Sequence, residues 1–121
     1  MDKGRKISGG KYKSQRKKKH YEKVGKVRTV KLKGTKKKKI KVRGGRIKTV
    51  LLSADTANVI DKKTKKSKTA KIITVIETPS NRFLARQNIL VKGAIINTEL
   101  GKAKITNRPS QEGKVEAELI D

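Results

Sequence analysis

Cysteine is absent from this chain, and His20 is its one histidine. Without cysteine the chain can form no disulfide, no thiolate metal site and no thiol nucleophile, which is typical of an intracellular protein. His20 lies inside a block of lysines, and neither histidines nor clustered carboxylates complete a catalytic or metal-binding set around it. We therefore expect no enzyme, no cofactor, no metal site and no small-molecule substrate.

Aromatic residues are also scarce, since the chain has Tyr12, Tyr21 and Phe83 and no tryptophan. Proteins that bind single-stranded nucleic acid by stacking place several aromatic side chains on one sheet. Three aromatics in 121 residues exclude stacking as the main mode of recognition. A nucleic-acid partner would instead be folded and contacted through its backbone.

Long hydrophobic runs are missing as well. The first ten residues lack the apolar stretch of a signal peptide, and no segment approaches the roughly 18 apolar residues of a membrane span. The bulky apolar residues before residue 40 do not recur at helical spacing, so an amphipathic membrane-binding helix is not expected either. The sequence predicts a soluble intracellular protein without a membrane partner.

Acidic residues are nearly absent from one half of the chain. The first fifty residues hold 22 lysines and arginines but two acids, Asp2 and Glu22, so +20 of the formal charge of +25 lies there. From residue 72 onward, seven basic residues face six acidic ones. So uneven a distribution indicates a polyanion partner, bound through phosphates with strong salt dependence. We predict a basic arm over residues 1–39 and a folded body over residues 40–121.

The body has the pattern of a small all-β protein. Short runs of β-branched residues are separated by turn residues, with hairpins expected around the lysine-rich loop 61–68 and Gly101 and a tight turn or bulge at Gly44-Gly45. We expect about six short strands closing into a small β-barrel, with Phe83 as its one core aromatic. Eight segments are candidates for these strands, namely residues 40–43, 47–52, 58–60, 70–77, 82–86, 94–98, 102–106 and 115–119.

The densest candidate site is the basic arm. Ser8-Gly9-Gly10-Lys11 lacks the spacing and the flanking strand of a P-loop, but two glycines let a backbone approach a phosphate closely. Residues 14–23 could form a short helix, N-capped by Ser14, when RNA phosphates offset the repulsion between its lysines. The RNA-binding residues predicted in the arm are Arg5, Ser8, Gly9, Gly10, Lys11, Arg16, Lys17, Lys18, Lys19 and His20.

A second candidate is the turn Arg43-Gly44-Gly45-Arg46. Arginine is rare here beside lysine, so Arg43 and Arg46 are predicted to make directed, bidentate contacts to phosphate or a guanine edge. The alternative is a surface hairpin with two solvated arginines. The loop from Lys62 to Lys68 either adds phosphate contacts or is solvated, and the sequence favours neither.

These motifs resemble those of the S8e family of small-subunit ribosomal proteins of archaea and eukaryotes. The family signature is Arg, two residues, Thr-Gly-Gly, five residues and a basic run that closes on a glycine. This chain has Arg5, then Ser8-Gly9-Gly10 with serine in place of threonine, then the basic run from Arg16 and Gly25. Further matches are Arg43-Gly44-Gly45, Asn58-Val59, residues 92–96, Arg108-Pro109 and Gln111-Glu112-Gly113. The compact length resembles the archaeal members.

The resemblance implies a non-enzymatic structural protein of the small ribosomal subunit, located on the cytoplasmic ribosome. Its implied partners are small-subunit ribosomal RNA, along which the arm would be threaded, and neighbouring small-subunit ribosomal proteins. Two alternatives stay open. One is a ribosome assembly factor of related fold, and the other is an architectural DNA-binding protein, which would bind duplex DNA as well as ribosomal RNA.

Overall fold

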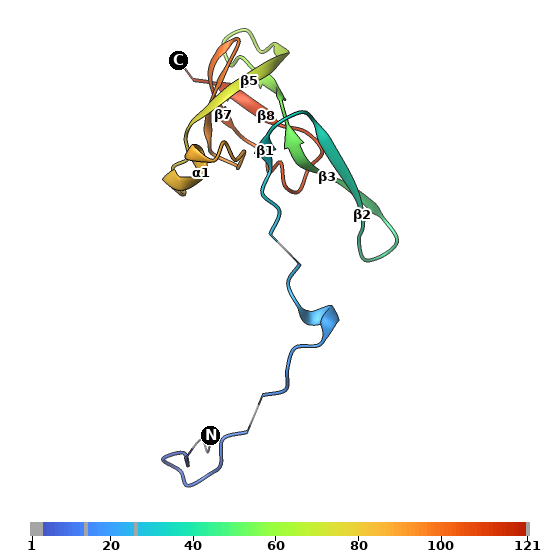
Figure 1. Cartoon of the computed structure of the whole chain (residues 1–121), viewed down its shortest axis with the longest axis vertical. Coiled ribbons are helices and arrows are strands. Elements are labelled where there is room, and N and C mark those ends of the chain that lie inside the picture. Colours follow the sequence, from blue (N-terminus) through green and yellow to red (C-terminus); the bar gives the residue numbers. More distant parts are fainter. Residues whose placement is uncertain (1–3, 14, 26, 121) are drawn as a thin grey trace.

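The computed structural model describes residues 4–13, 15–25 and 27–120. The body is a closed five-stranded barrel, which confirms the predicted all-β class (Figure 1). Its strands run antiparallel in sequence order, and a parallel pairing between the first and the last closes it. The barrel strands are β4 (Thr56–Ile60), β5 (Ser67–Glu77), β6 (Ile95–Thr98), β7 (Gly101–Ile105) and β8 (Glu116–Leu119).

The hairpin predicted around Gly101 is present as β6 and β7. Ile96 pairs with Ala103, and both are fully buried, whereas the flanking Lys102 and Lys104 are exposed. Gly101 has φ of 122°, in the region that favours glycine, and its carbonyl accepts a hydrogen bond from the Thr98 hydroxyl at 2.8 Å. Alternation of apolar and charged residues therefore sets which face of each strand meets the core.

The core of the barrel combines small and branched side chains. A five-stranded barrel has a narrow interior, so alanines must alternate with larger residues to fill it without strain. Its main cluster of buried apolar side chains contains no aromatic residue and consists of Val30, Leu51, Ala54, Ala57, Val59, Ala70, Ile72, Val75, Leu90, Ala94, Ile96, Ala103, Ile105, Val115 and Ala117.

A second, three-stranded sheet adjoins the barrel in the order β1-β3-β2. It consists of β1 (Lys31–Leu32), β2 (Lys36–Lys41) and β3 (Ile47–Ala54), and Asp55 alone separates β3 from β4. Of the tight turn or bulge expected at Gly44-Gly45, the structure has the turn, which joins β2 and β3 as a hairpin. However, its first strand begins at Lys36 rather than at Ile40. A strand at the edge of a sheet can be made of lysines, because their side chains stay exposed to water on both faces. The arm boundary at residue 39 stays a prediction.

The prediction of a strand over residues 82–86 is wrong, because these residues form the one-turn helix α1 (Arg82–Arg86). Asn81 caps the helix: its side-chain oxygen accepts a hydrogen bond from the backbone N–H of Phe83 at 2.9 Å. Phe83 is also not a core residue, since 56% of its surface is exposed. Leu84 and Ala85 are the partly buried residues of this turn, so the helix directs Phe83 outward.

The arm joins the body through Val30, which is buried. Its carbonyl accepts a hydrogen bond from the backbone N–H of Leu90 at 2.8 Å, and Arg28 donates to the carbonyl of Ser110 at 3.2 Å. Residues 33–35 then connect β1 to β2. The Ser53 hydroxyl donates to the Gly34 carbonyl, and the Thr35 hydroxyl donates to the Asp55 carboxylate. The hydrogen bond from Thr35 lowers the pKa of Asp55.

Candidate nucleic-acid interface

The predicted arm residues around Gly9-Gly10 lie in one small turn. The backbone N–H of Lys6 donates to the Gly10 carbonyl at 2.9 Å, and Arg5 pairs with Lys11 in an antiparallel bridge. The Arg5 guanidinium donates to the Gly9 carbonyl at 3.1 Å, and Gly9 has φ of 78°. Ser8, Gly9, Gly10 and Lys11 are exposed around this turn, so it presents backbone groups and cations to a partner.

The basic block that follows is extended rather than helical. Residues 15–19 have no regular structure, and a 3-10 turn, η1, covers His20–Glu22. Lys17, Lys18, Lys19 and His20 are exposed. The predicted cap Ser14 lies outside the described residues, and the helix expected on bound RNA stays a prediction.

Arg16 has a partner within the arm. Its guanidinium donates to both carboxylate oxygens of Glu22, at 2.8 and 2.6 Å, and Glu22 also accepts from the Lys19 backbone N–H at 3.0 Å. The hydrogen bonds from Arg16 and then Lys19 hold the pKa of Glu22 below its usual value. Because this pKa is lowered, the ion pair is fully present at any pH above the usual glutamate pKa. It is lost only as the pH falls through the lowered pKa. The pair therefore persists at neutral pH.

The arginines of the second candidate flank the tip of the β2–β3 hairpin. The Val42 backbone N–H donates to the Arg46 carbonyl at 2.9 Å, and Gly44 and Gly45 have φ of 84° and 77°. Arg43 and Arg46 are exposed. The predicted residues thus occupy three places along the molecule, namely the Gly9-Gly10 turn, the basic block and the hairpin tip, rather than one pocket (Figure 1).

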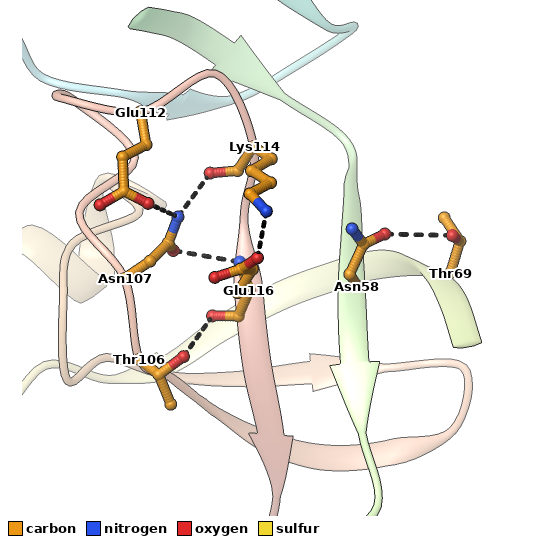
Figure 2. A network of polar contacts seen from close by, with 7 residues as sticks. All are labelled: Asn58, Thr69, Thr106, Asn107, Glu112, Lys114 and Glu116. Atoms are coloured by element: carbon orange, nitrogen blue, oxygen red, sulfur yellow. Dashed lines mark hydrogen bonds and ion pairs between the residues drawn. The ribbon is translucent and has the colours of Figure 1, made fainter. Parts of the chain in front are cut away.

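A polar network centred on Asn107 holds the loop that meets the arm (Figure 2). The Asn107 amide nitrogen donates to Glu112 at 2.9 Å and to the Lys114 carbonyl at 2.8 Å, while its oxygen accepts from the Glu116 N–H at 3.0 Å. The same loop accepts hydrogen bonds from Leu51 N–H through two carbonyls and from Arg28 through Ser110. The loop therefore links the barrel, β3 and the root of the arm.

Two further features are not found in the described ranges. No group of three or more histidines, cysteines or carboxylates gathers there as metal ligands would. Among the described helices, none has the length and apolar composition needed to span a membrane.

Residues 1–120, which include every segment just described, match the sequence profile of ribosomal protein S8e. The chain belongs to the S8e family of ribosomal proteins. The match includes the arm, the hairpin and the barrel, so the predicted binding residues all lie inside the family's domain.

Curated relatives support this membership and its archaeal type. The chain is 58% identical over 67 residues to small ribosomal subunit protein eS8 of Sulfurisphaera tokodaii, covering 55% of this chain and 52% of the relative. The protein of the same name from Sulfolobus acidocaldarius is 54% identical over 67 residues, with 55% and 52% covered. That from Methanocorpusculum labreanum is 45% identical over 117 residues, 97% of this chain and 94% of the relative. The chain thus spans about half the length of the first two and nearly all of the third.

In this S8e-family chain, two structural features escape prediction from the sequence. Four of the five lysines of β2, Lys36 to Lys39, fall within the predicted irregular arm, although the alternation at Ile40 and Val42 marks the end of that strand. The Asn107 network has no sequence signal, because its partners come together only when the loop folds back on β8.

Replacing Glu22 with Gln should strengthen binding to ribosomal RNA. The change removes one negative charge and frees Arg16 for phosphate, so the salt slope should steepen by up to about 0.9 per added contact on duplex RNA. Filter binding across a salt series measures this. The matched control is Glu77→Gln, which removes the same charge from an exposed position on the barrel. Equal effects of both variants would show that overall charge matters and the Arg16 pair does not.

Replacing Gly44 or Gly45 with Ala should open the hairpin tip. Nothing crowds an added Cβ at either position, so the cost is that of a left-handed backbone, about 1–2 kcal/mol per residue. Amide exchange of Val42, whose N–H closes the turn, should accelerate roughly tenfold. Gly34→Ala, also uncrowded but without a positive φ, is the control and should leave this exchange unchanged. Unaltered amide exchange in the Gly44 and Gly45 variants would contradict the expected cost of a left-handed backbone for alanine at these positions.

Proposed function

We propose that this chain is a non-enzymatic structural constituent of the small ribosomal subunit that binds and stabilises folded small-subunit ribosomal RNA. One observation carries the proposal: +20 of the formal charge of +25 lies in the first fifty residues. The comparisons support the same setting, because the relatives bear the name small ribosomal subunit protein eS8. Its site of action is the cytoplasmic ribosome, beside other small-subunit proteins.

The mechanism is electrostatic neutralisation of closely packed phosphates. Lys17, Lys18 and Lys19 are exposed, and within the described ranges no ion pair engages their side chains. Ordering an extended arm costs roughly 1–2 kcal/mol per residue in backbone entropy. Charge-assisted hydrogen bonds to phosphate offset that cost only on the RNA, which makes ordering of the arm depend on binding.

The two glycine turns serve the same chemistry in different ways. At Gly9-Gly10 the backbone can approach a phosphate without a Cβ between them, while Ser8 and Lys11 supply donors. At the hairpin tip Arg43 and Arg46 project from a closed turn, so their guanidinium groups can contact phosphate or a guanine edge bidentately. The barrel fixes where both elements leave the body, through Val30 and β3.

Crosslinking with mass spectrometry on purified small subunits from the source cells tests the proposal. Crosslinks from the Gly9 to Lys19 region to small-subunit ribosomal RNA, at about one copy per salt-washed particle, are the expected result. Presence on precursor particles alone would replace the proposal with a ribosome assembly factor. Recovery on chromatin, with equal affinity for duplex DNA and ribosomal RNA, would replace it with an architectural DNA-binding protein.

A further inference from the structure

The β2–β3 hairpin carries a row of lysines that the contacts predicted for Arg43 and Arg46 at its tip do not include. Five of the six residues of β2 are lysines, and all five are exposed. Figure 1 shows the hairpin projecting from the barrel, separate from the extended arm and away from the C-terminus. Unlike the arm, it is held in shape by the register with β3, in which Lys38 pairs with Val50 and Lys41 with Ile47.

The lysines lie on both faces of this ribbon. Side chains alternate along a strand, so Lys37, Lys39 and Lys41 share one face and Lys38 projects from the other, with neighbours on a face about 6.6–6.8 Å apart. The edge of β2 away from β3 is open, because β2 is an outer strand of its sheet. Arg43 and Arg46 extend the same charge to the tip.

In the part of the chain that the structure describes, no acidic side chain pairs with the lysines of β2. The residues opposite Lys37, Lys38, Lys39 and Lys41 are Leu51, Val50, Thr49 and Ile47. Within residues 27–120, no ion pair joins an acid to a lysine of β2 or to the tip arginines. Repeated like charges on a fixed ribbon repel one another, so binding of a polyanion lowers the electrostatic free energy most.

The composition of the hairpin favours double-helical RNA. Residues 36–48 contain no aromatic side chain, which argues against stacking on unpaired bases. A two-stranded ribbon is thin enough to lie between two backbones, as such ribbons do in the major groove of DNA. In A-form RNA the major groove is too narrow to admit the ribbon, so the hairpin would lie across its opening, where lysines on its two faces can reach phosphates of both strands.

We propose that the β2–β3 hairpin binds double-helical RNA through phosphates of both strands, as a preformed element that acts independently of the arm. This inference rests on the proposed function, from which it takes RNA as the partner. It adds the form of the RNA and the lysines that contact it.

The test uses the full chain with Lys38, Lys39 and Lys41 all changed to Gln. The probes are an RNA duplex of about 20 base pairs, longer than the roughly 16 that a double-stranded-RNA domain spans, and oligouridine of the same length. The salt slope on the duplex should fall by up to about 2.7, or 0.9 for each phosphate that is no longer neutralised. The decrease on oligouridine should be smaller. A second variant with Thr at the three positions, which favours strands, preserves the test if the Gln variant unfolds.

The matched control changes Lys71, Lys102 and Lys104 to Gln, which removes the same charge from exposed positions on the barrel. A decrease in duplex affinity that exceeds the control and exceeds the decrease on oligouridine supports the proposal. A decrease equal to the control, or equal on both probes, overturns it. The lysines would then serve only to keep an edge strand from pairing with other chains.

The affinities of the wild-type chain for folded ribosomal RNA and for duplex DNA are measured in the same series. They separate failure of the inference about the hairpin from failure of the proposed function. If that RNA is bound in preference to duplex DNA while the hairpin variant equals the control, the inference about the hairpin fails alone. If wild type shows no such preference, the proposed function fails.

Discussion

Changing Lys17, Lys18 and Lys19 together to Gln should weaken binding to folded ribosomal RNA by up to several hundredfold at about 0.1 M salt. Each phosphate contact on a duplex releases about 0.9 counterion, which corresponds to roughly an eightfold change of affinity per contact at that salt. The slope of log affinity against log salt should fall by up to about 2.7. Fluorescence anisotropy with a labelled ribosomal RNA fragment across a salt series measures both quantities.

The barrel variant with Gln at Lys71, Lys102 and Lys104 is the control for this experiment, because it loses equal charge outside the arm. Its melting curve and that of the arm variant should match wild type, since all six positions are exposed. An arm variant with unchanged affinity and slope would show that the arm is not the binding element, and the proposed mechanism would fall.

Replacing Asn107 with Ala should lower the free energy of unfolding by about 2–4 kcal/mol. The change leaves the Lys114 carbonyl and the Glu116 N–H without their partner, and each unsatisfied buried group costs about 1–3 kcal/mol. Asn107 is 9% exposed, so water replaces these bonds poorly. Urea denaturation followed by circular dichroism measures the destabilisation.

Asn58→Ala is the matched control, because Asn58 is exposed and its side-chain oxygen accepts a hydrogen bond from the Thr69 hydroxyl at 3.1 Å (Figure 2). A surface bond of this kind contributes about 0.5–1.5 kcal/mol. Equal destabilisation by both variants would contradict the role given to the Asn107 network. The Asn107 variant should also increase amide exchange of Leu51, whose N–H donates to the same loop.

Elements governed by local pattern could be predicted from the sequence. The hairpins at Gly44-Gly45 and Gly101 follow from alternating strands with a left-handed turn between them, and both are present. The closed barrel follows from many short strands and the lack of long helices. Each of these signals acts within about ten residues, where side-chain alternation and turn chemistry decide the conformation.

Elements governed by tertiary context could not be predicted from the sequence. The lysines of β2 form a strand because β3 supplies the pairing, and nothing within the lysine run itself favours one. Residues 82–86 contain the short apolar run Phe83-Leu84-Ala85, which is compatible with a strand, but they follow the cap Asn81, which is the better signal. The size of Phe83 predicts a core position, although the helix turns it outward. Of the candidate site, the structure locates every predicted residue but tests none of their contacts with RNA.

If the arm and the hairpin both bind RNA as proposed, their attachment to one body affects how long the chain stays bound. Val30 anchors the arm, and residues 33–35, held by Ser53 and Asp55, lead directly to Lys36. The two elements then act as a bivalent ligand, because capture of one raises the effective concentration of the other. An arm that dissociates from a phosphate stays near it while the hairpin is bound, so it can rebind before the chain escapes. The residence time of the chain therefore exceeds that of either element alone.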